Sequence, residues 1–170
     1  MKRGCLFAIR GEAAKAVQAI DATIAARRST GATVSNTYYL SHSALAHAVL
    51  GQFDEAGRSL DQALSIVQAS GERWYEAEIH RTAGEIALLP PERDAAKAQA
   101  HFERALRIAR AQQARSLELR AAMSLARVWR DQGEAPRACV LLAPLYGWFT
   151  EGFDTLDLRA AKALLDELAS

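Results

Sequence analysis

The sequence predicts an all-helical protein made of antiparallel helix hairpins that stack side by side. One observation is a turn motif, in which a glycine that can end a helix is followed five residues later by a small residue that allows close helix packing. The motif occurs as Gly11 with Ala16, Gly51 with Ala56 and Gly133 with Ala138. The other observations are a regular period between copies and the helical spacing of apolar residues within them.

The period divides the chain into four units and a final helix. The small positions Ala16, Ala56, Ala98 and Ala138 are separated by 40, 42 and 40 residues. The matching positions in the first helix of each unit are Gly4, Ala44, Gly84 and Ala126, separated by 40, 40 and 42 residues. The two additional residues therefore fall between Gly84 and Ala98, at the Pro90-Pro91 turn, because proline cannot continue a helix. We expect one domain over residues 1–170, with units at approximately 1–31, 32–71, 72–113 and 114–149 and a cap at 156–169.

Turn and cap residues place the individual helices. We expect helices at residues 1–10, 12–29, 33–50, 53–70, 73–89, 93–113, 116–132, 135–149 and 156–169. Gly71 and Gly133 fall at their boundaries. Ser116 and Thr155 can act as N-caps, which accept a hydrogen bond from an unpaired backbone N–H. Pro144 lies inside the eighth helix and should kink it or end it.

Each unit carries an apolar stripe that a single helix cannot bury. The stripe after Ala56 and the equivalent stripe after Ala98 consist of Leu60, Ala63, Leu64 and Val67, and of Phe102, Ala105, Leu106 and Ala109. Stacked hairpins bury such stripes in a continuous core, so we expect an α-α superhelix. The last helix has one apolar and one charged side, which suits a C-terminal capping helix.

Composition excludes several classes of protein. The chain has 170 residues, of which 50% are hydrophobic and 24% charged, and its net charge is +1. It is therefore neither disordered nor basic enough to suggest nucleic-acid binding. No apolar run reaches the roughly 18 residues that span a membrane. Cys5 and Cys139 have no CxxC spacing, which favours reduced thiols and a cytoplasmic location.

The residues at and around the turn motif resemble the tetratricopeptide repeat. The resemblance is carried by Leu40, Ala44, Gly51, Phe53, Ala56, Leu60 and Ala63 in the second unit, and by Leu125, Ala126, Trp129, Gly133, Ala138 and Leu142 in the fourth. It implies a tetratricopeptide-like superhelix of antiparallel hairpins that binds other proteins. The usual period is about 34 residues, so the helices here are longer, and the proline that closes each repeat is absent.

Residues 71–81, 116–127 and 146–154 resemble the C-terminal repeat region of bacterial predicted-ATPase proteins. Such proteins are often joined to a class III adenylate/guanylate cyclase domain or to a DNA-binding regulator domain, so the resemblance implies a regulatory or scaffolding segment. The sequence contains no GxxxxGK[ST] phosphate loop, and we expect no enzymatic activity. Matched to the other units, Met1 falls inside a first helix, which leads us to expect a longer parent protein.

Catalytic and metal-binding patterns are weak. Glu76 and His80 share a helix face as metal ligands can, but charge pairing explains this spacing equally well and no third ligand is evident. His47 occupies a packing position, and Cys139 suits a small buried side chain. No nucleophile, base and orienting group form a motif. We therefore predict no metal and no cofactor.

Arginines dominate the second half of the chain, at positions 104, 107, 110, 115, 120, 127, 130 and 137. Nucleic-acid binding, pairing with the acidic residues of 151–170, and a solvated surface are three interpretations. The nearly neutral total favours the last two.

The concave surface of the expected superhelix is the candidate binding site. The repeat register places twelve residues there, namely Tyr38, Ser41, His42, Leu45, Glu78, Arg81, Thr82, Glu85, Arg120, Met123, Ser124 and Arg127. The surface could hold an extended peptide or a helix, with Arg120 and Arg127 binding a carboxylate. We predict a non-catalytic interaction and regulatory module of a cytoplasmic signalling protein. Alternatives are a small-ligand sensor in the same groove and a homodimer formed through the N-terminal edge.

Overall fold

The computed structural model describes residues 13–29, 35–89 and 93–169, and every regular element in these ranges is an α-helix. The helices are α2 (Ala13–Ser29), α3 (Asn36–Val49), α4 (Phe53–Ser70), α5 (Glu76–Ala87), α6 (Ala95–Ala111), α7 (Arg115–Asp131), α8 (Ala135–Gly147) and α9 (Leu156–Leu168). The all-α prediction is therefore confirmed. The expected helix at 1–10, the Pro90-Pro91 turn and the N-terminal edge lie outside the described residues. None of these helices is both long and apolar enough to cross a membrane.

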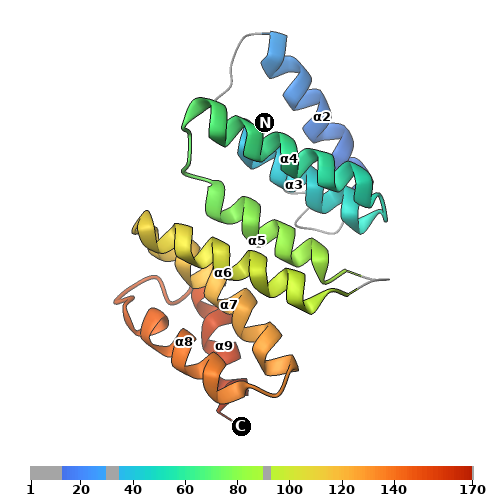
Figure 1. Ribbon diagram of the computed structural model, residues 1–170. Coiled ribbons are helices and arrows are strands. Elements are labelled where there is room, and N and C mark those ends of the chain that lie inside the picture. Colours follow the sequence, from blue (N-terminus) through green and yellow to red (C-terminus); the bar gives the residue numbers. More distant parts are fainter. Residues whose placement is uncertain (1–12, 30–34, 90–92, 170) are drawn as a thin grey trace.

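The helices follow one another in chain order from one end of the molecule to the other (Figure 1). α3 packs on α4, α5 on α6 and α7 on α8. In addition, α3, α5, α7 and α9 contact one another in succession, and we call them the central row. The helices α4, α6 and α8 do not contact one another in this way. One side of the described chain is therefore a continuous layer, whereas the other side has gaps between helices.

Apolar side chains form two main cores. The N-terminal core lies among α2, α3 and α4 and includes Ile20, Leu40 and Val67, with Ile79 reaching it from α5. The C-terminal core lies among α6, α7, α8 and α9 and includes Phe102 of α6. Helix α5 therefore lies where the two cores meet.

The small repeat positions in the described helices are fully buried. Each of Ala16, Ala44, Ala56, Ala98, Ala126 and Ala138 is 0% exposed. Gly84 occupies the equivalent position in α5, where an added Cβ would lie 2.4 Å from the ring of Phe102. The role predicted for the small positions, close helix approach, is thus confirmed at these residues.

The chain reverses direction at glycines with positive φ. Gly51 ends the α3–α4 turn with φ 76°, and Gly133 ends the α7–α8 turn with φ 82°. Side chains other than glycine rarely adopt this conformation. The turn motif read from the sequence therefore has the backbone geometry that the glycine was expected to provide.

The predicted caps and the proline of the eighth helix can be compared with the structure. Thr155 holds the N-cap position of α9, but its side chain makes no cap hydrogen bond. Ser116 is not an N-cap, because α7 begins at Arg115 and the carbonyl of Ala114 already accepts the N–H of Glu118 at 2.9 Å. Pro144 does not end α8, which continues to Gly147. The carbonyl that Pro144 leaves without a helical partner belongs to Val140, whose residue is 76% exposed, so water can satisfy it.

We expect Gly84→Ala to destabilise the protein by about 1–2 kcal/mol, because the clash with Phe102 outweighs the gain in helix propensity. Gly57→Ala in α4 is the matched control. A Cβ there meets no atom within 4 Å, so this change should stabilise by up to about 1 kcal/mol. Urea unfolding of both variants measures the difference, and a Gly84→Ala protein as stable as Gly57→Ala would contradict the packing argument.

Candidate functional site

The twelve predicted binding residues lie on α3, α5 and α7, three neighbouring helices of the central row. We call this set the predicted binding face. Five of its members, Ser41, Glu78, Thr82, Met123 and Ser124, are buried in the described structure. The others are partly exposed. The buried members therefore hold the helices together, and the partly exposed ones are those that a partner could reach.

A buried carboxylate organises the centre of this face. Glu78 of α5 is 1% exposed. Arg81 donates to both of its oxygens, from Nε at 3.0 Å and from Nη2 at 3.2 Å. Arg120 of α7 places Nη2 3.1 Å from Oε2 of the same carboxylate. Two arginines thus compensate one buried negative charge, and the second of them ties α7 to α5.

The network extends to a second carboxylate and to the last helix. Glu85 accepts hydrogen bonds from Ser124 Oγ at 2.7 Å and from Arg81 Nη1 at 3.0 Å. Arg120 also places Nε 3.9 Å from Asp157 of α9. Arg120 is therefore already paired within the chain. Arg127, seven residues further along α7, makes no hydrogen bond or ion pair with the residues that the structure describes.

An aromatic cluster borders the network on the α3 side. The ring of Tyr38 lies edge-on to His42 at 4.6 Å and to Tyr75 at 5.2 Å between centroids. Burial lowers the pKa of His42; Arg120 and Arg81 lower it further, and Glu78 opposes them. The predicted binding face therefore changes from aromatic on α3, through ion pairs on α5, to Arg127 on α7, which pairs with none of the described residues.

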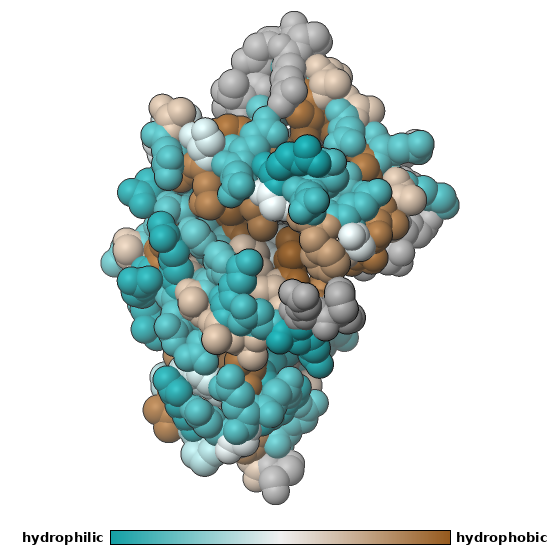
Figure 2. All heavy atoms as spheres, turned by 45° about the vertical axis from the view of Figure 1, so that its right-hand side comes forward, coloured by the Kyte–Doolittle hydropathy of each residue, from teal (hydrophilic) through white to brown (hydrophobic). Residues whose placement is uncertain are grey.

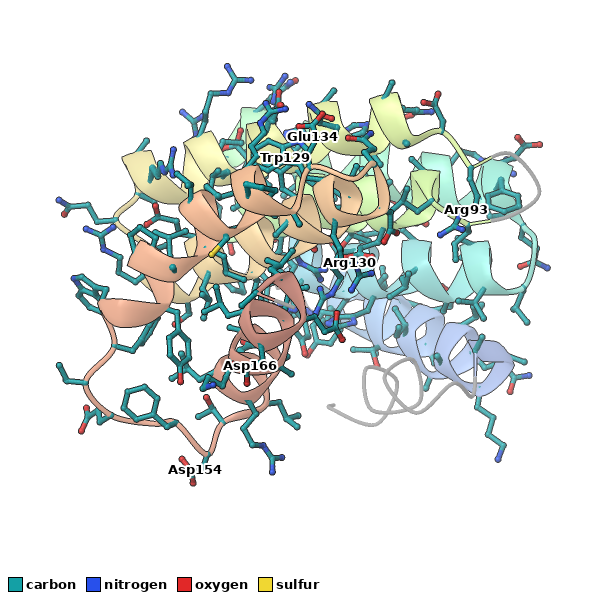
Figure 3. All side chains as sticks on the ribbon, turned by 90° about the horizontal axis from the view of Figure 1, so that it is seen from below. Arg93, Trp129, Arg130, Glu134, Asp154 and Asp166 are labelled. Atoms are coloured by element: carbon teal, nitrogen blue, oxygen red, sulfur yellow. The ribbon has the colours of Figure 1, made fainter. Side chains whose placement is uncertain are left out.

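Part of the basic region pairs with the acidic end of the chain, as one interpretation of the sequence expected. Arg130 donates to Glu167 of α9 at 2.6 Å and also bonds Asp131. In Figure 3, Glu134 lies beside Trp129 at the turn into α8, while Arg130 is on another side of α7. Arg137 covers the Trp129 ring, with its guanidinium carbon 3.9 Å from the ring centre. These arginines are therefore used in packing α7, α8 and α9.

The Glu76–His80 pair does not form. Arg73 donates two hydrogen bonds to Glu76, because its planar guanidinium matches both carboxylate oxygens. Among the described residues, no group of three or more His, Cys, Asp or Glu could hold a metal ion. His47 is half-buried and its Nδ1 lies 2.7 Å from Gln52 Oε1. Cys139 packs against the C-terminal core, but it is only partly buried, whereas its sequence context predicted a small buried side chain.

A groove that the sequence did not indicate lies between α4 and α6, over α5. Its volume is about 670 Å³, and its walls include Leu60 and Leu64 from α4, Ile86 from α5 and His101 from α6. In Figure 2 the molecule narrows between its upper and lower parts, and apolar side chains are exposed there. We call this the α4–α6 groove. It lies on the opposite side of α5 from Glu78 and Arg81.

His80 of α5 lies in the wall of the groove. The residue is 4% exposed, and neither ring nitrogen has a hydrogen-bond partner among the described residues. Its ring stacks on His101 with centroids 5.9 Å apart. Burial, followed by the nearby Arg104 and His101, lowers the pKa of His80 to about 4. The His80 ring is therefore neutral near pH 7.

One signal in the sequence could have indicated the groove. Gly57 lies inside α4, where glycine weakens a helix. This signal is not specific, because the groove depends on how far α4 lies from α6. The structure shows the difference directly, since the stripe on α6 is buried throughout, whereas Leu60 and Leu64 of the equivalent stripe on α4 are only partly buried.

No protein-family model matches this chain, and no curated protein sequence matches it. The resemblances described from the sequence therefore remain predictions, and the function has to be argued from the structure.

We expect Glu78→Gln to destabilise the protein by about 3 kcal/mol, because it leaves Arg81 and Arg120 facing a buried neutral group. Glu85→Gln removes a carboxylate from the same network at a more exposed position and should cost less than about 1 kcal/mol. Chemical unfolding of the two variants provides the test. Equal losses of unfolding free energy in the two variants would contradict the argument that burial makes the charge of Glu78 necessary.

Stability should fall as the pH falls through the window set by His80. The unfolded ring takes up a proton near its ordinary pKa of about 6.5, and the folded ring only near about 4. Between these values the unfolded state binds more protons, so acid favours unfolding by up to about 3 kcal/mol from this residue.

The measurement is the difference in unfolding free energy between wild type and His80→Phe across this pH window. The unfolding free energy of wild type should fall steadily towards acid relative to that of His80→Phe, because phenylalanine has no proton to bind. A difference that does not change with pH would contradict a buried, neutral His80.

Proposed function

We propose that this chain is a tetratricopeptide-like superhelix that acts as a non-catalytic interaction and regulatory module, and that a protein or peptide segment binds to the predicted binding face. The observation that carries the proposal is the alignment of α3, α5 and α7 in the central row. This alignment joins an aromatic cluster, a charged network and an unpaired arginine into one surface.

The network supports binding because it is already ordered. Arg81 and Arg120 are fixed by Glu78, so a partner that contacts them immobilises few additional side chains. Binding to a preorganised surface costs less conformational entropy than binding to mobile side chains. The shape of this surface is therefore available before the partner arrives.

Arg127 is the residue most suited to hold a partner. It lies on the same side of α7 as Arg120 and Ser124, at helical spacing of seven and three residues. Arg120 already pairs with two carboxylates of the chain, whereas Arg127 pairs with none of the described residues. We therefore assign the carboxylate contact to Arg127, while Arg120 positions the surface around it. A peptide with an Asp or Glu side chain, or a free C-terminus, fits this role.

The test is selection from a displayed library of random peptides, followed by affinity measurements on the selected sequences. Selected peptides should be rich in acidic residues, and Arg127→Ala should weaken their binding about tenfold at low salt, with a smaller effect at high salt. Arg104→Ala removes an exposed arginine from α6, away from the central row, and should leave the affinity unchanged. Peptides that bind wild type and Arg127→Ala equally would exclude this binding mode.

A further inference from the structure

We propose that the α4–α6 groove binds a small, uncharged, largely apolar molecule that carries one hydrogen-bonding group, and that His80 receives this group. The site is distinct from the predicted binding face, because α5 presents Glu78, Arg81 and Glu85 to one side and His80, Ala83 and Ala87 to the other. The proposal therefore stands whether or not the face on the other side binds a peptide.

The groove has the size and lining of a small-molecule site. Its volume of about 670 Å³ lies within the range of roughly 300–1,000 Å³ that is usual for such sites. Leu60, Leu64 and Ile86 are partly buried members of its apolar wall, and Phe53, which also lines it, is 37% exposed. An apolar ligand in the groove would cover side chains that otherwise remain in contact with water.

Packing within the chain does not explain why residue 57 is a glycine. Gly84 is required, because the ring of Phe102 occupies the position of a Cβ. At Gly57 a Cβ would meet nothing within 4 Å, and the residue lies in the middle of α4 where alanine would stabilise the helix. What glycine does provide at this position is additional width in the groove.

His80 is the group in the wall of the groove that a polar ligand atom would contact. A neutral imidazole has one nitrogen that donates and one that accepts, and both nitrogens of His80 are buried without a hydrogen-bond partner among the described residues. Such groups in folded proteins are normally satisfied by a protein group, by water or by a ligand. Because neither nitrogen is open to the groove in this structure, binding includes a turn of the His80 ring towards the ligand, whose hydroxyl or amide can either donate to the ring or accept from it.

The surrounding charges favour an uncharged ligand. Arg104 and Arg107 act on the His80 ring strongly enough to lower its pKa, so they would also repel a cation placed beside it. Asp61 and Asp94 line the groove together with Lys97, so its wall has no excess of positive charge to hold an anion. Apolar walls make the burial of either charge unfavourable.

The probe is 2-naphthol, an aromatic molecule with one hydroxyl, and naphthalene is the matched compound without it. Calorimetric titration of the full chain should show saturable binding of 2-naphthol. NMR of the histidine rings should show a shift of the His80 nitrogens with 2-naphthol and a smaller one with naphthalene. No saturable binding at millimolar concentrations, or a perturbation of other histidines only, would overturn the proposal.

Gly57→Leu is the decisive variant, because Gly57 lines the groove and an added Cβ there meets nothing within 4 Å, so the leucine side chain occupies groove space. It should weaken 2-naphthol binding at least about tenfold, while its melting temperature stays unchanged or rises. Gly147→Leu is the control, since that position at the end of α8 is also open and lies outside the groove. Undiminished binding to Gly57→Leu, or an equal loss in Gly147→Leu, would show that the probe binds elsewhere.

Discussion

The close approach of Gly84 in α5 to Phe102 in α6 determines how the two halves of this protein meet. A Cβ at Gly84 would lie 2.4 Å from the Phe102 ring, so only glycine allows the two helices to come this close. Phe102 belongs to the C-terminal core, whereas Ile79, nearer the start of α5 than Gly84, belongs to the N-terminal core. Helix α5 is therefore fixed from both sides, and the position of every residue on it follows from this contact.

Both candidate sites use α5. On the side of the central row, Glu78 accepts from Arg81 and pairs with Arg120, which links α5 to α7 and through Asp157 to α9. On the other side, His80 lies in the wall of the α4–α6 groove, which exists because α4 and α6 do not contact each other. On the first side, the charged groups of α5 are paired within the chain. The second side is apolar and holds a ring that has no hydrogen-bond partner among the described residues. These opposite properties are why we assign a peptide to one side and an uncharged small molecule to the other.

The features that could be read from the sequence are those set by backbone geometry. The small positions recur every 40 to 42 residues because each marks a place where two helices touch, and the turn glycines have positive φ because the chain reverses there. The sequence could not show which partner a long side chain would choose. Glu76 pairs with Arg73 rather than His80, and Arg120 pairs with Glu78. The groove was hidden because the stripes of α4 and α6 look alike in sequence, and only their packing distinguishes them.

The claim on which both sites depend is that α5 joins the two cores into one cooperative structure. Native-state hydrogen exchange of the α5 and α6 amides tests it directly. We expect the amides of these two helices to open together, with the highest protection in the molecule and with the same response to denaturant. If α5 instead opened with α2–α4 while α6–α9 stayed protected, the two halves would be separate units, and the arrangement described for both sites would be contradicted.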